Sequence, residues 1–542
     1  MPLVFPYRKT LALLLAAFPW INPAAFGPSA AVWPWLASAW AVIGLCLLAP
    51  GGAFGAQYSR ALGWCAAALV ATATLSQGGP SPEVLMLAGA LMLVVLAAAV
   101  ARHASMARAL QTGVLTAAVV SAVLGLVQYF GAAAAFGPWI NRAETGEAFA
   151  NLRQPNQFAT LCWLGAAVIV FGSLRLSRWG GLCLMVLLAS ASAASGSRTG
   201  ALALVLLLAL AAWWSGPRRR DRWLLTVGAA TAYLAASALL PVILEAFTGN
   251  FAHRAVWSRL VGNEGCFSRL VLWSNVLHLV AQKPLTGWGW GELDYAHFVT
   301  LYPGERFCDI LDNAHNLPLH LAVELGIPTA VAACAAGLYC SWRQRPWSEP
   351  NAQRQLAWSF LGLILLHSML EYPLWYGPFQ MVFGYAIGWL RAPPPQSATP
   401  QRWWRAAAVA GFTAATVYAA FDYVRVSQIY LPPEERLAVW RGNTLEQVRR
   451  SWLFAGPARF ADLTLRTVTG GDAKETYELS QLTLHYSPEP RVIERAVESA
   501  TLLGRDREAE LLLVRFQAAF PRDYDSWRNA QKWLAPTPPE HP

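Results

Sequence analysis

Long apolar runs separated by short polar segments fill most of the chain up to about residue 425. A helix that crosses the hydrocarbon core of a bilayer needs about 20 mostly apolar residues, so the pattern predicts about thirteen membrane-spanning helices. The predicted spans lie near residues 10–24, 35–49, 61–76, 83–101, 109–130, 157–174, 179–194, 199–215, 223–247, 317–340, 355–372, 376–391 and 403–421. The chain is therefore predicted to be an all-α polytopic membrane protein.

Beyond this region the pattern changes to amphipathic segments with the period of a helix, such as "RVIERAVESATLLG" and "EAELLLVRFQAAF". The prolines Pro457, Pro488 and Pro521 stand 31 and 33 residues apart, close to the period of tetratricopeptide (TPR)-like helical hairpins. We therefore expect a transmembrane domain over residues 1–425, with a large loop at 248–316, and a TPR-like helical domain over 426–542. The second domain either docks a protein or glycan partner or packs as a cap on the membrane domain.

The composition agrees with a membrane protein, because 56% of the residues are apolar and only 13% are charged. The net charge of +10 is spread along the chain instead of clustered on one polar face, which argues against a nucleic-acid partner. The first apolar run, behind Arg8 and Lys9, is compatible with a signal peptide, but "FPWINPAAFG" is a poor cleavage region and favours a retained helix.

Positive charge predicts the orientation of the spans. Seventeen Lys and Arg residues lie in the short loops on one side, against eight in the longer loops on the other. Because cytoplasmic loops carry the excess, the N-terminus is predicted to be cytoplasmic, and the loop at 248–316 and the tail beyond 422 face outward. Cys266 and Cys308 both lie in that loop, where an oxidising compartment would permit a disulfide; a paired and an unpaired state are both open.

Three predicted spans begin at the outer face with polar sequences: "NLRQPNQFAT", "SGSRTG" and "DNAHNLPLH". The first turn of a helix carries unpaired amide groups and partial positive charge, so such starts bind anions readily. Arg153 and Arg198 would add charge-assisted hydrogen bonds. Each arginine alone is also explained by snorkelling to the membrane interface, but three such sequences at one depth favour a site.

In "DNAHNLPLH", Asn316 is well placed as a helix N-cap with Pro318 in the first turn, whereas neither capping nor packing explains His315. His315 and His320 are five residues apart, which does not place them on one helical face, and no further ligands complete a zinc set. We therefore predict no metal site. A neutral histidine beside an acid, here Asp312, serves instead as a general base or orients a hydroxyl group.

Two further stretches have the composition of a functional cavity. "RLVLWSNVLHLVAQKPLTGWGWGEL" begins with Arg269 and ends in a turn with Trp288 and Trp290, whose rings either cover a sugar or lie at the membrane interface. "HSMLEYPLWYGPF" places Glu371 and Tyr372 at the outer end of a span, where they need polar surroundings. Cations, a histidine and aromatic rings together predict transfer from a polyprenyl pyrophosphate, whose leaving group carries negative charge.

At this point a family resemblance is visible. "RQPNQFATL", "SGSRTG", "PLTGWGWGEL", "DNAHNLPLHLAVELGIP" and "HSMLEYPL" resemble, in this order, the Wzy/WaaL superfamily of glycan polymerases and O-antigen ligases. More narrowly, they resemble the PglL-type bacterial O-oligosaccharyltransferases, or pilin glycosylation ligases. The resemblance covers most of residues 150–380.

The resemblance implies a C-type (GT-C-like) membrane glycosyltransferase in the bacterial inner membrane that works without a metal or other cofactor. It would transfer a glycan from undecaprenyl pyrophosphate to a Ser or Thr hydroxyl of a pilin-type or other periplasmic protein. His315 would be essential, and Arg198 and Arg269 would contact the pyrophosphate. Asn156 and Gln157 lie in "RQPNQF", where related proteins often have histidine in place of Gln157, so the role of that position stays open.

The sequence leaves other functions open. An O-antigen ligase that uses lipid A core as acceptor, or a Wzy-type polymerase, differs only in the acceptor, and the helical tail and "RQPNQF" favour a protein acceptor. A lipid-linked glycan transporter is less favoured, because the polar sequences gather at one face and no repeated halves are visible. A scaffold protein would leave the histidine and the arginines unexplained.

Overall fold

The computed structural model describes residues 7–24, 26–49, 56–214, 219–249, 265–391 and 402–534, and within these ranges the secondary structure is helical, without strands. The chain divides into two compact units. The first comprises residues 1–70, 86–262 and 335–418, and the second comprises residues 71–85, 263–334 and 419–542. The second unit thus joins part of the predicted outer loop to the predicted C-terminal domain, and the domain boundary near residue 425 stays a prediction.

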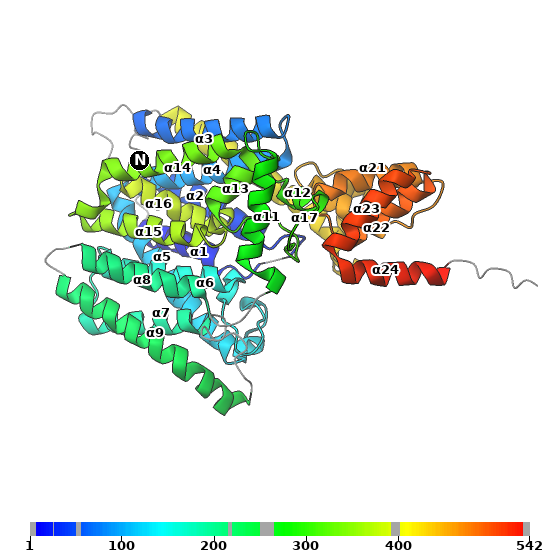
Figure 1. Cartoon of the computed structure of the whole chain (residues 1–542). Helices are drawn as coiled ribbons and strands as arrows, with labels where there is room; N and C mark the ends of the chain where they lie inside the picture. The colour runs from blue at the N-terminus through cyan, green and yellow to red at the C-terminus, as the bar shows by residue number, and fades with distance from the viewer. Residues whose placement is uncertain are drawn as a thin grey trace, which may run out of the picture. The chain divides into compact units, whose positions relative to one another are not determined.

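The long helices of the first unit run roughly parallel to one another (Figure 1). They are α1 (Arg8–Ile21), α2 (Val32–Leu48), α5 (Ala104–Tyr129), α6 (Pro155–Phe171), α7 (Arg178–Ala194), α8 (Arg198–Trp213), α9 (Arg219–Thr248), α15 (Ala352–Ser368) and α16 (Gly377–Trp389), with short 3-10 turns η1 (Ala132–Trp139), η2 (Ala150–Leu152), η4 (Pro346–Ser348) and η5 (Pro373–Trp375). Four helices contribute residues to both units: α3 (Ala56–Ser76), α4 (Pro82–Ala101), α14 (Ile327–Gln344) and α17 (Arg402–Ser427).

Each predicted apolar run coincides with one helix except the tenth. The run at 317–340 was predicted as a single span, and this is wrong: it forms two helices, α13 (Leu317–Leu325) and α14, separated at Gly326. Gly326 has φ +84°, and a Cβ atom there would lie 2.2 Å from the carbonyl oxygen of Leu285. The break therefore comes from close packing against a distant segment, and only glycine fits.

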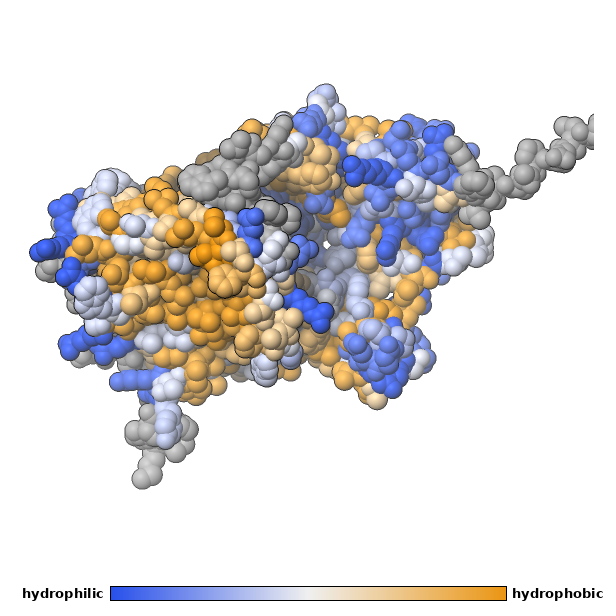
Figure 2. Space-filling model, turned by 90° about the horizontal axis from the view of Figure 1, so that it is seen from below, coloured by the Kyte–Doolittle hydropathy of each residue, from blue (hydrophilic) through white to orange (hydrophobic). Residues whose placement is uncertain are grey.

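The apolar helices are those of a helical membrane protein. Among the described residues, four helical segments are long and apolar enough to cross a bilayer: Pro82–Ala101, Met106–Tyr129, Arg219–Thr248 and Ala406–Tyr430. Several other apolar helices are shorter, so the number of thirteen spans stays a prediction. Hydrophobic side chains cover a broad area of the face shown in Figure 2. On α9, Phe247 is 83% exposed, as expected of a residue that faces lipid.

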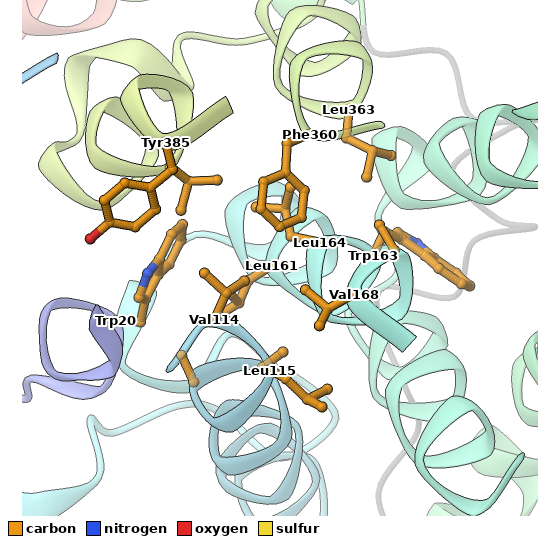
Figure 3. Packing of buried hydrophobic residues seen from close by; sticks show 14 of the residues in the cluster. Trp20, Val114, Leu115, Leu161, Trp163, Leu164, Val168, Phe360, Leu363 and Tyr385 are labelled. Carbon is orange, nitrogen blue, oxygen red and sulfur yellow. The ribbon is translucent and has the colours of Figure 1, made fainter. Parts of the chain in front are cut away.

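The core of the first unit is built around α6. Trp163 and Leu164 of this helix are fully buried, and they belong to one cluster with residues of α1, α5, α15 and α16 (Figure 3). The ring of Trp20 packs edge-on against Phe379 with the ring centroids 4.9 Å apart. Because buried side chains pack at crystal-like density, this core holds the starts of α6 and α8 in fixed positions.

The second unit combines outer-loop helices with a C-terminal helical array. Its elements are η3 (Gly265–Phe267), α11 (Arg269–Gln282), α12 (Leu293–Val299), α13, η6 (Gln428–Tyr430), η7 (Pro433–Glu435), α18 (Ala438–Arg441), α19 (Thr444–Arg449), α20 (Ala455–Leu465), α21 (Ala473–Leu484), α22 (Pro490–Leu502), α23 (Asp506–Ala519) and α24 (Pro521–Leu534). From α20 to α24 each helix packs against the next, and the two segments predicted as amphipathic form α22 and α23. The TPR-like assignment stays a prediction.

One hydrophobic core joins the outer loop to the C-terminal helices. Phe298 of α12 is buried among Leu463, Val492 and Phe516. Next to this core, Nδ1 of His485 lies 2.6 Å from a carboxylate oxygen of Glu292, which ends the "GWGWGE" sequence. The C-terminal helices therefore form part of the unit that carries the loop motifs.

Candidate active site

In the first unit, a series of hydrogen bonds connects three of the predicted polar sequences. The Ser197 hydroxyl, which caps α8, donates to Oδ1 of Asn156 over 2.6 Å. Nδ2 of Asn156, in the first turn of α6, donates to a carboxylate oxygen of Glu371 over 3.1 Å. The starts of α6 and α8 and the segment after α15 are thereby connected through Asn156.

The series of hydrogen bonds continues into the interior through two residues that were not predicted from the sequence. The Thr160 hydroxyl donates to the carbonyl of Asn156 over 2.9 Å and lies 3.0 Å from Nδ1 of His367. His367 is buried at the end of α15, and its carbonyl accepts the backbone N–H of Glu371 over 2.8 Å. The spacing of His367 and Glu371, four residues apart, is the sequence signal that could have identified the pair.

The remaining predicted residues of the first unit lie nearby along the chain. Arg153 has φ +61°, and its guanidinium donates to the carbonyl groups of Pro23 over 2.7 Å and Ala30 over 3.4 Å. These contacts give Arg153 a structural role in holding the α1–α2 connection, and its predicted substrate contact stays a prediction. Arg198 is the first residue of α8, and the backbone N–H of Gln157 donates to the cap residue Gln154. Tyr372 stacks on Tyr376 with the centroids 6.0 Å apart.

In the second unit, the sequence "DNAHN" forms a tight loop before α13. His315 has φ +50°, and its backbone N–H donates to Oδ1 of Asn313 over 2.9 Å. The indole N–H of Trp273 donates to the carbonyl of Ala314 over 3.1 Å. Asn316 accepts the N–H of Leu319 over 3.1 Å, which confirms it as the N-cap of α13.

The "GWGWG" turn packs its backbone against the end of α13. The N–H groups of Trp288 and Gly289 donate to the carbonyls of Val323 over 2.8 Å and Glu324 over 3.0 Å. Gly287 has φ +70°, and a Cβ atom there would lie 2.3 Å from the carbonyl of Glu324, so glycine is required. The turn therefore clamps the backbone at the end of α13.

The two tryptophans of this turn have partners within the protein. The indole N–H of Trp288 donates to the carbonyl of Leu279 over 3.1 Å, and Nζ of Lys283 lies 4.0 Å from the ring centroid. The Trp290 ring meets the His320 ring edge-on, with centroids 5.8 Å apart. Both side chains are half-buried, so a sugar contact at their remaining exposed surface stays a prediction.

Arg269 begins α11, whose cap is Ser268. Just before it, Cys266 forms a disulfide with Cys308, so the structure contains the pairing that the sequence left open. Asn275 of α11 supports the same segment, because its side chain donates to the carbonyl of Glu305 over 2.9 Å and accepts the N–H of Phe307 over 2.8 Å. The segment that leads to Asp312 and His315 is thus tied to the helix that carries Arg269.

Acidic groups accumulate around this loop. Desolvation raises the pKa of Asp294 well above its ordinary value, and the carboxylates of Glu292, Asp312 and Glu324 raise it further. Desolvation by the surrounding loop also raises the pKa of Asp312, although its side chain is exposed, while nearby His315 and His320 act in the opposite direction. Among the described residues, no cluster of three His, Cys, Asp or Glu side chains has the arrangement of a metal site.

His297 has a different role from His315. Its ring lies 2.8 Å from the Tyr302 hydroxyl and 3.2 Å from the carbonyl of Phe307. Burial, with a further contribution from Arg306, lowers the pKa of His297 to about 3, so this imidazole stays neutral. Burial also lowers the pKa of Arg306 to about 10. His297 therefore supports the segment of Tyr302 and Phe307 as a neutral side chain.

Two family models match separate parts of the chain. Residues 183–334 match a family model described as O-antigen ligase, and residues 355–535 match a model described as virulence factor membrane-bound polymerase, C-terminal. A general O-oligosaccharyltransferase of Acinetobacter baylyi is 27% identical over 132 residues, which are 23% of this chain and 22% of that protein. The alignment thus spans less than a quarter of this relative.

Proposed function

We propose, from its confirmed resemblance to the Wzy/WaaL superfamily and its O-oligosaccharyltransferase branch, that this protein is a glycan transferase. Its donor is a glycan linked to undecaprenyl pyrophosphate, and its acceptor is a Ser or Thr hydroxyl of a pilin-type or other periplasmic protein. The protein would lie in the bacterial inner membrane, with about thirteen spans, and the reaction would take place on the periplasmic side.

One finding supports the proposal above the others. The match to the O-antigen ligase model spans residues 183–334 and therefore contains Arg198, Arg269, Asp312 and His315. In the second unit, the loop that carries His315 is hydrogen-bonded to α11, the helix that begins with Arg269. The proposed base and the proposed cation for the donor thus belong to one folded unit.

In the proposed reaction, the acceptor oxygen attacks the anomeric carbon of the glycan, and the bond from that carbon to the pyrophosphate oxygen breaks. The imidazole of His315 takes the proton of the acceptor hydroxyl, and the leaving undecaprenyl pyrophosphate keeps the electron pair of the broken bond. Arg269 and Arg198 stabilise the charge of the leaving group. Asp312 stabilises the protonated His315 that results.

The other residues predicted to bind substrate, Asn156 among them, have a supporting role in this proposal. Glu371, Tyr372, Gln157 and Arg153 are proposed to contact donor or acceptor groups, and Trp288 and Trp290 to cover a sugar ring. The C-terminal helices are proposed to be a TPR-like domain that docks the acceptor protein.

A second acceptor is favoured by the names of the matching family models, which describe an O-antigen ligase and a polymerase. With lipid A core or a growing glycan as acceptor, the chemistry at His315 and the arginines is unchanged. Only the direction from which the hydroxyl group arrives differs.

The test is transfer by the purified full chain in detergent, with an undecaprenyl pyrophosphate-linked glycan and either a pilin or a lipid A core as acceptor. We expect transfer to pilin that is lost in H315A. The matched control is H278A, because His278 is a half-buried histidine of the same unit that packs on Tyr302 at 5.4 Å. Transfer to lipid A core alone would keep the mechanism and change the acceptor, and transfer to neither would defeat the proposal.

Variants of the arginines test the donor contact separately. Loss of one charge-assisted contact in a dry site removes about 2–4 kcal/mol of transition-state stabilisation. R269A and R198A should therefore lower kcat/KM for the donor by roughly 30-fold to 1,000-fold. Unchanged values in both variants would contradict the proposed role.

A further inference from the structure

His315 occupies a backbone conformation that needs support. Its φ of +50° lies in the left-handed region, which residues other than glycine seldom adopt unless neighbouring groups hold them there. Such positions are common at active sites, where the surrounding structure sets the direction of one side chain. The groups that hold His315 are those that contact the backbone on either side of it.

Three side chains contact the short segment Asn313–His315. Asn313 accepts the N–H of His315, and Trp273 donates to the carbonyl of Ala314. The third is His320, because the N–H of Ala314 donates to its Nδ1 over 3.5 Å, at the long end of the range for a hydrogen bond. The peptide groups on both sides of Ala314 are thus held by α11 and α13.

Glu324 holds His320 in turn. Nε2 of His320 lies 3.2 Å from a carboxylate oxygen of Glu324, one helical turn along α13, and the two side chains are only 2% and 1% exposed. Nδ1 of His320 accepts from the N–H of Ala314, and Nε2 faces the Glu324 carboxylate without the alignment of a hydrogen bond. Both ring nitrogens therefore face groups of the protein, which suits a positioning group better than a base.

The "GWGWG" turn contacts both Glu324 and His320. The N–H of Gly289 donates to the carbonyl of Glu324, and the Trp290 ring packs edge-on against His320. The turn thus holds both the backbone of Glu324 and the ring of its partner. A continuous set of contacts runs from this turn through Glu324 and His320 to the segment of His315.

We propose that Glu324 and His320 are positioning residues that keep His315 in its left-handed conformation, with its imidazole directed for proton transfer. The proposal rests on the function proposed above for His315, and it assigns a role to a histidine and a buried acid that the sequence had not connected. It also gives the "GWGWG" sequence a task in catalysis that does not require contact with a sugar.

The test compares E324M, E324Q and a matched control in the full chain. Methionine keeps the volume of Glu324 but removes the oxygen atoms, so kcat should fall about tenfold while KM for the donor changes less than about twofold. Glutamine keeps an oxygen opposite Nε2, so E324Q should retain at least a third of kcat, roughly. The control is H297Q, since His297 is as buried as His320 but contacts Tyr302 and Phe307 instead of the His315 segment.

Each outcome decides the question. Loss of kcat in E324M with retention in E324Q and H297Q supports positioning by an oxygen acceptor. If E324Q falls as far as E324M, the charge of Glu324 matters instead of its position, and the proposal is overturned. If H297Q loses as much kcat as E324M, the effect is general destabilisation, and the proposal also fails.

A second readout does not depend on activity. Hydrogen exchange of the peptide containing Ala314 and His315 should be about tenfold faster in E324M than in the wild type, and unchanged in H297Q, because only E324M releases the Ala314 amide. Equal protection in all three proteins would overturn the positioning role even if transfer is observed. Faster exchange without any wild-type transfer would keep the positioning role and reject the proposed function.

Discussion

Replacing Gly287 with alanine tests the contact between the "GWGWG" turn and the end of α13. The new Cβ atom would lie 2.3 Å from both the carbonyl carbon and the carbonyl oxygen of Glu324. Neither atom belongs to a flexible side chain, so the turn and the end of α13 must separate by about 1 Å to restore an ordinary van der Waals contact. The hydrogen bonds from Trp288 and Gly289 to α13 span this same gap.

Two contributions add up to the free-energy cost of G287A. The φ of +70° is unfavourable for alanine by about 1–2 kcal/mol. Loss of the two hydrogen bonds adds about 0.5–1.5 kcal/mol each. G287A should therefore lower the free energy of opening of this turn by roughly 2–5 kcal/mol.

Two other glycines of the second unit provide a graded control. Gly289 has φ +118°, but its nearest neighbour is the flexible side chain of Glu292, so G289A should cost only the backbone strain of about 1–3 kcal/mol. Gly304 has open space around it and no positive φ, so G304A should be neutral or stabilising by up to about 1 kcal/mol.

The assay is native-state hydrogen exchange of a peptide covering residues 285–292 in detergent, with glycan transfer measured on the same samples. The expected order of protection is G304A above G289A above G287A. If G287A is as well protected as G304A, the close approach of the turn to Glu324 is not a feature of the folded protein in solution. The account of the "GWGWG" sequence would then be refuted.

Three further changes test other parts of the structure. N156D places a second carboxylate about 3.1 Å from that of Glu371, so its thermal midpoint should fall below that of N156A; equal midpoints would show that the two side chains do not meet. C308S opens a disulfide between residues 42 apart and should lower the free energy of unfolding of the second unit by about 2–4 kcal/mol, which is contradicted if reductant leaves the wild-type midpoint unchanged. His297 has a folded pKa of about 3, below its unfolded value of about 6.5, so its contribution to stability is complete above pH 6.5 and is lost as the pH falls toward 3. Over that window H297Q should flatten the pH dependence by up to about 1.4 kcal/mol per pH unit, and parallel curves for both proteins would contradict the assignment.

Local sequence predicted the features that depend on neighbouring residues. Asn316 caps α13 because its side chain reaches an N–H three residues ahead, and the pattern at 316–319 is sufficient to infer this. The break at Gly326 could not be inferred in the same way, because the apolar run continues through it. The break depends on Leu285, which reaches the site only in the folded chain.

In the candidate site, too, local features were predicted from the sequence and contacts between distant residues were not. Polar sequences at the outer ends of spans indicated Asn156 and Glu371, but their hydrogen bond joins residues 215 positions apart. The sequence predicted that Arg153 contacts an anion. Its guanidinium instead donates to backbone carbonyl groups, and sequence patterns do not reveal such contacts. His320 and Glu324 carried a usable signal, since residues four apart share a helical face.

The shared core of α12 and the C-terminal helices has a consequence for how the protein is made and recombined. Phe298 emerges from the ribosome long before Leu463, Val492 and Phe516, which bury it, so the outer loop stays incomplete until the end of synthesis. A chimera that exchanges only the C-terminal helices would leave Phe298 and Glu292 facing foreign side chains. We therefore expect a functional chimera to need the C-terminal helices together with α12, although the two segments lie far apart in the sequence.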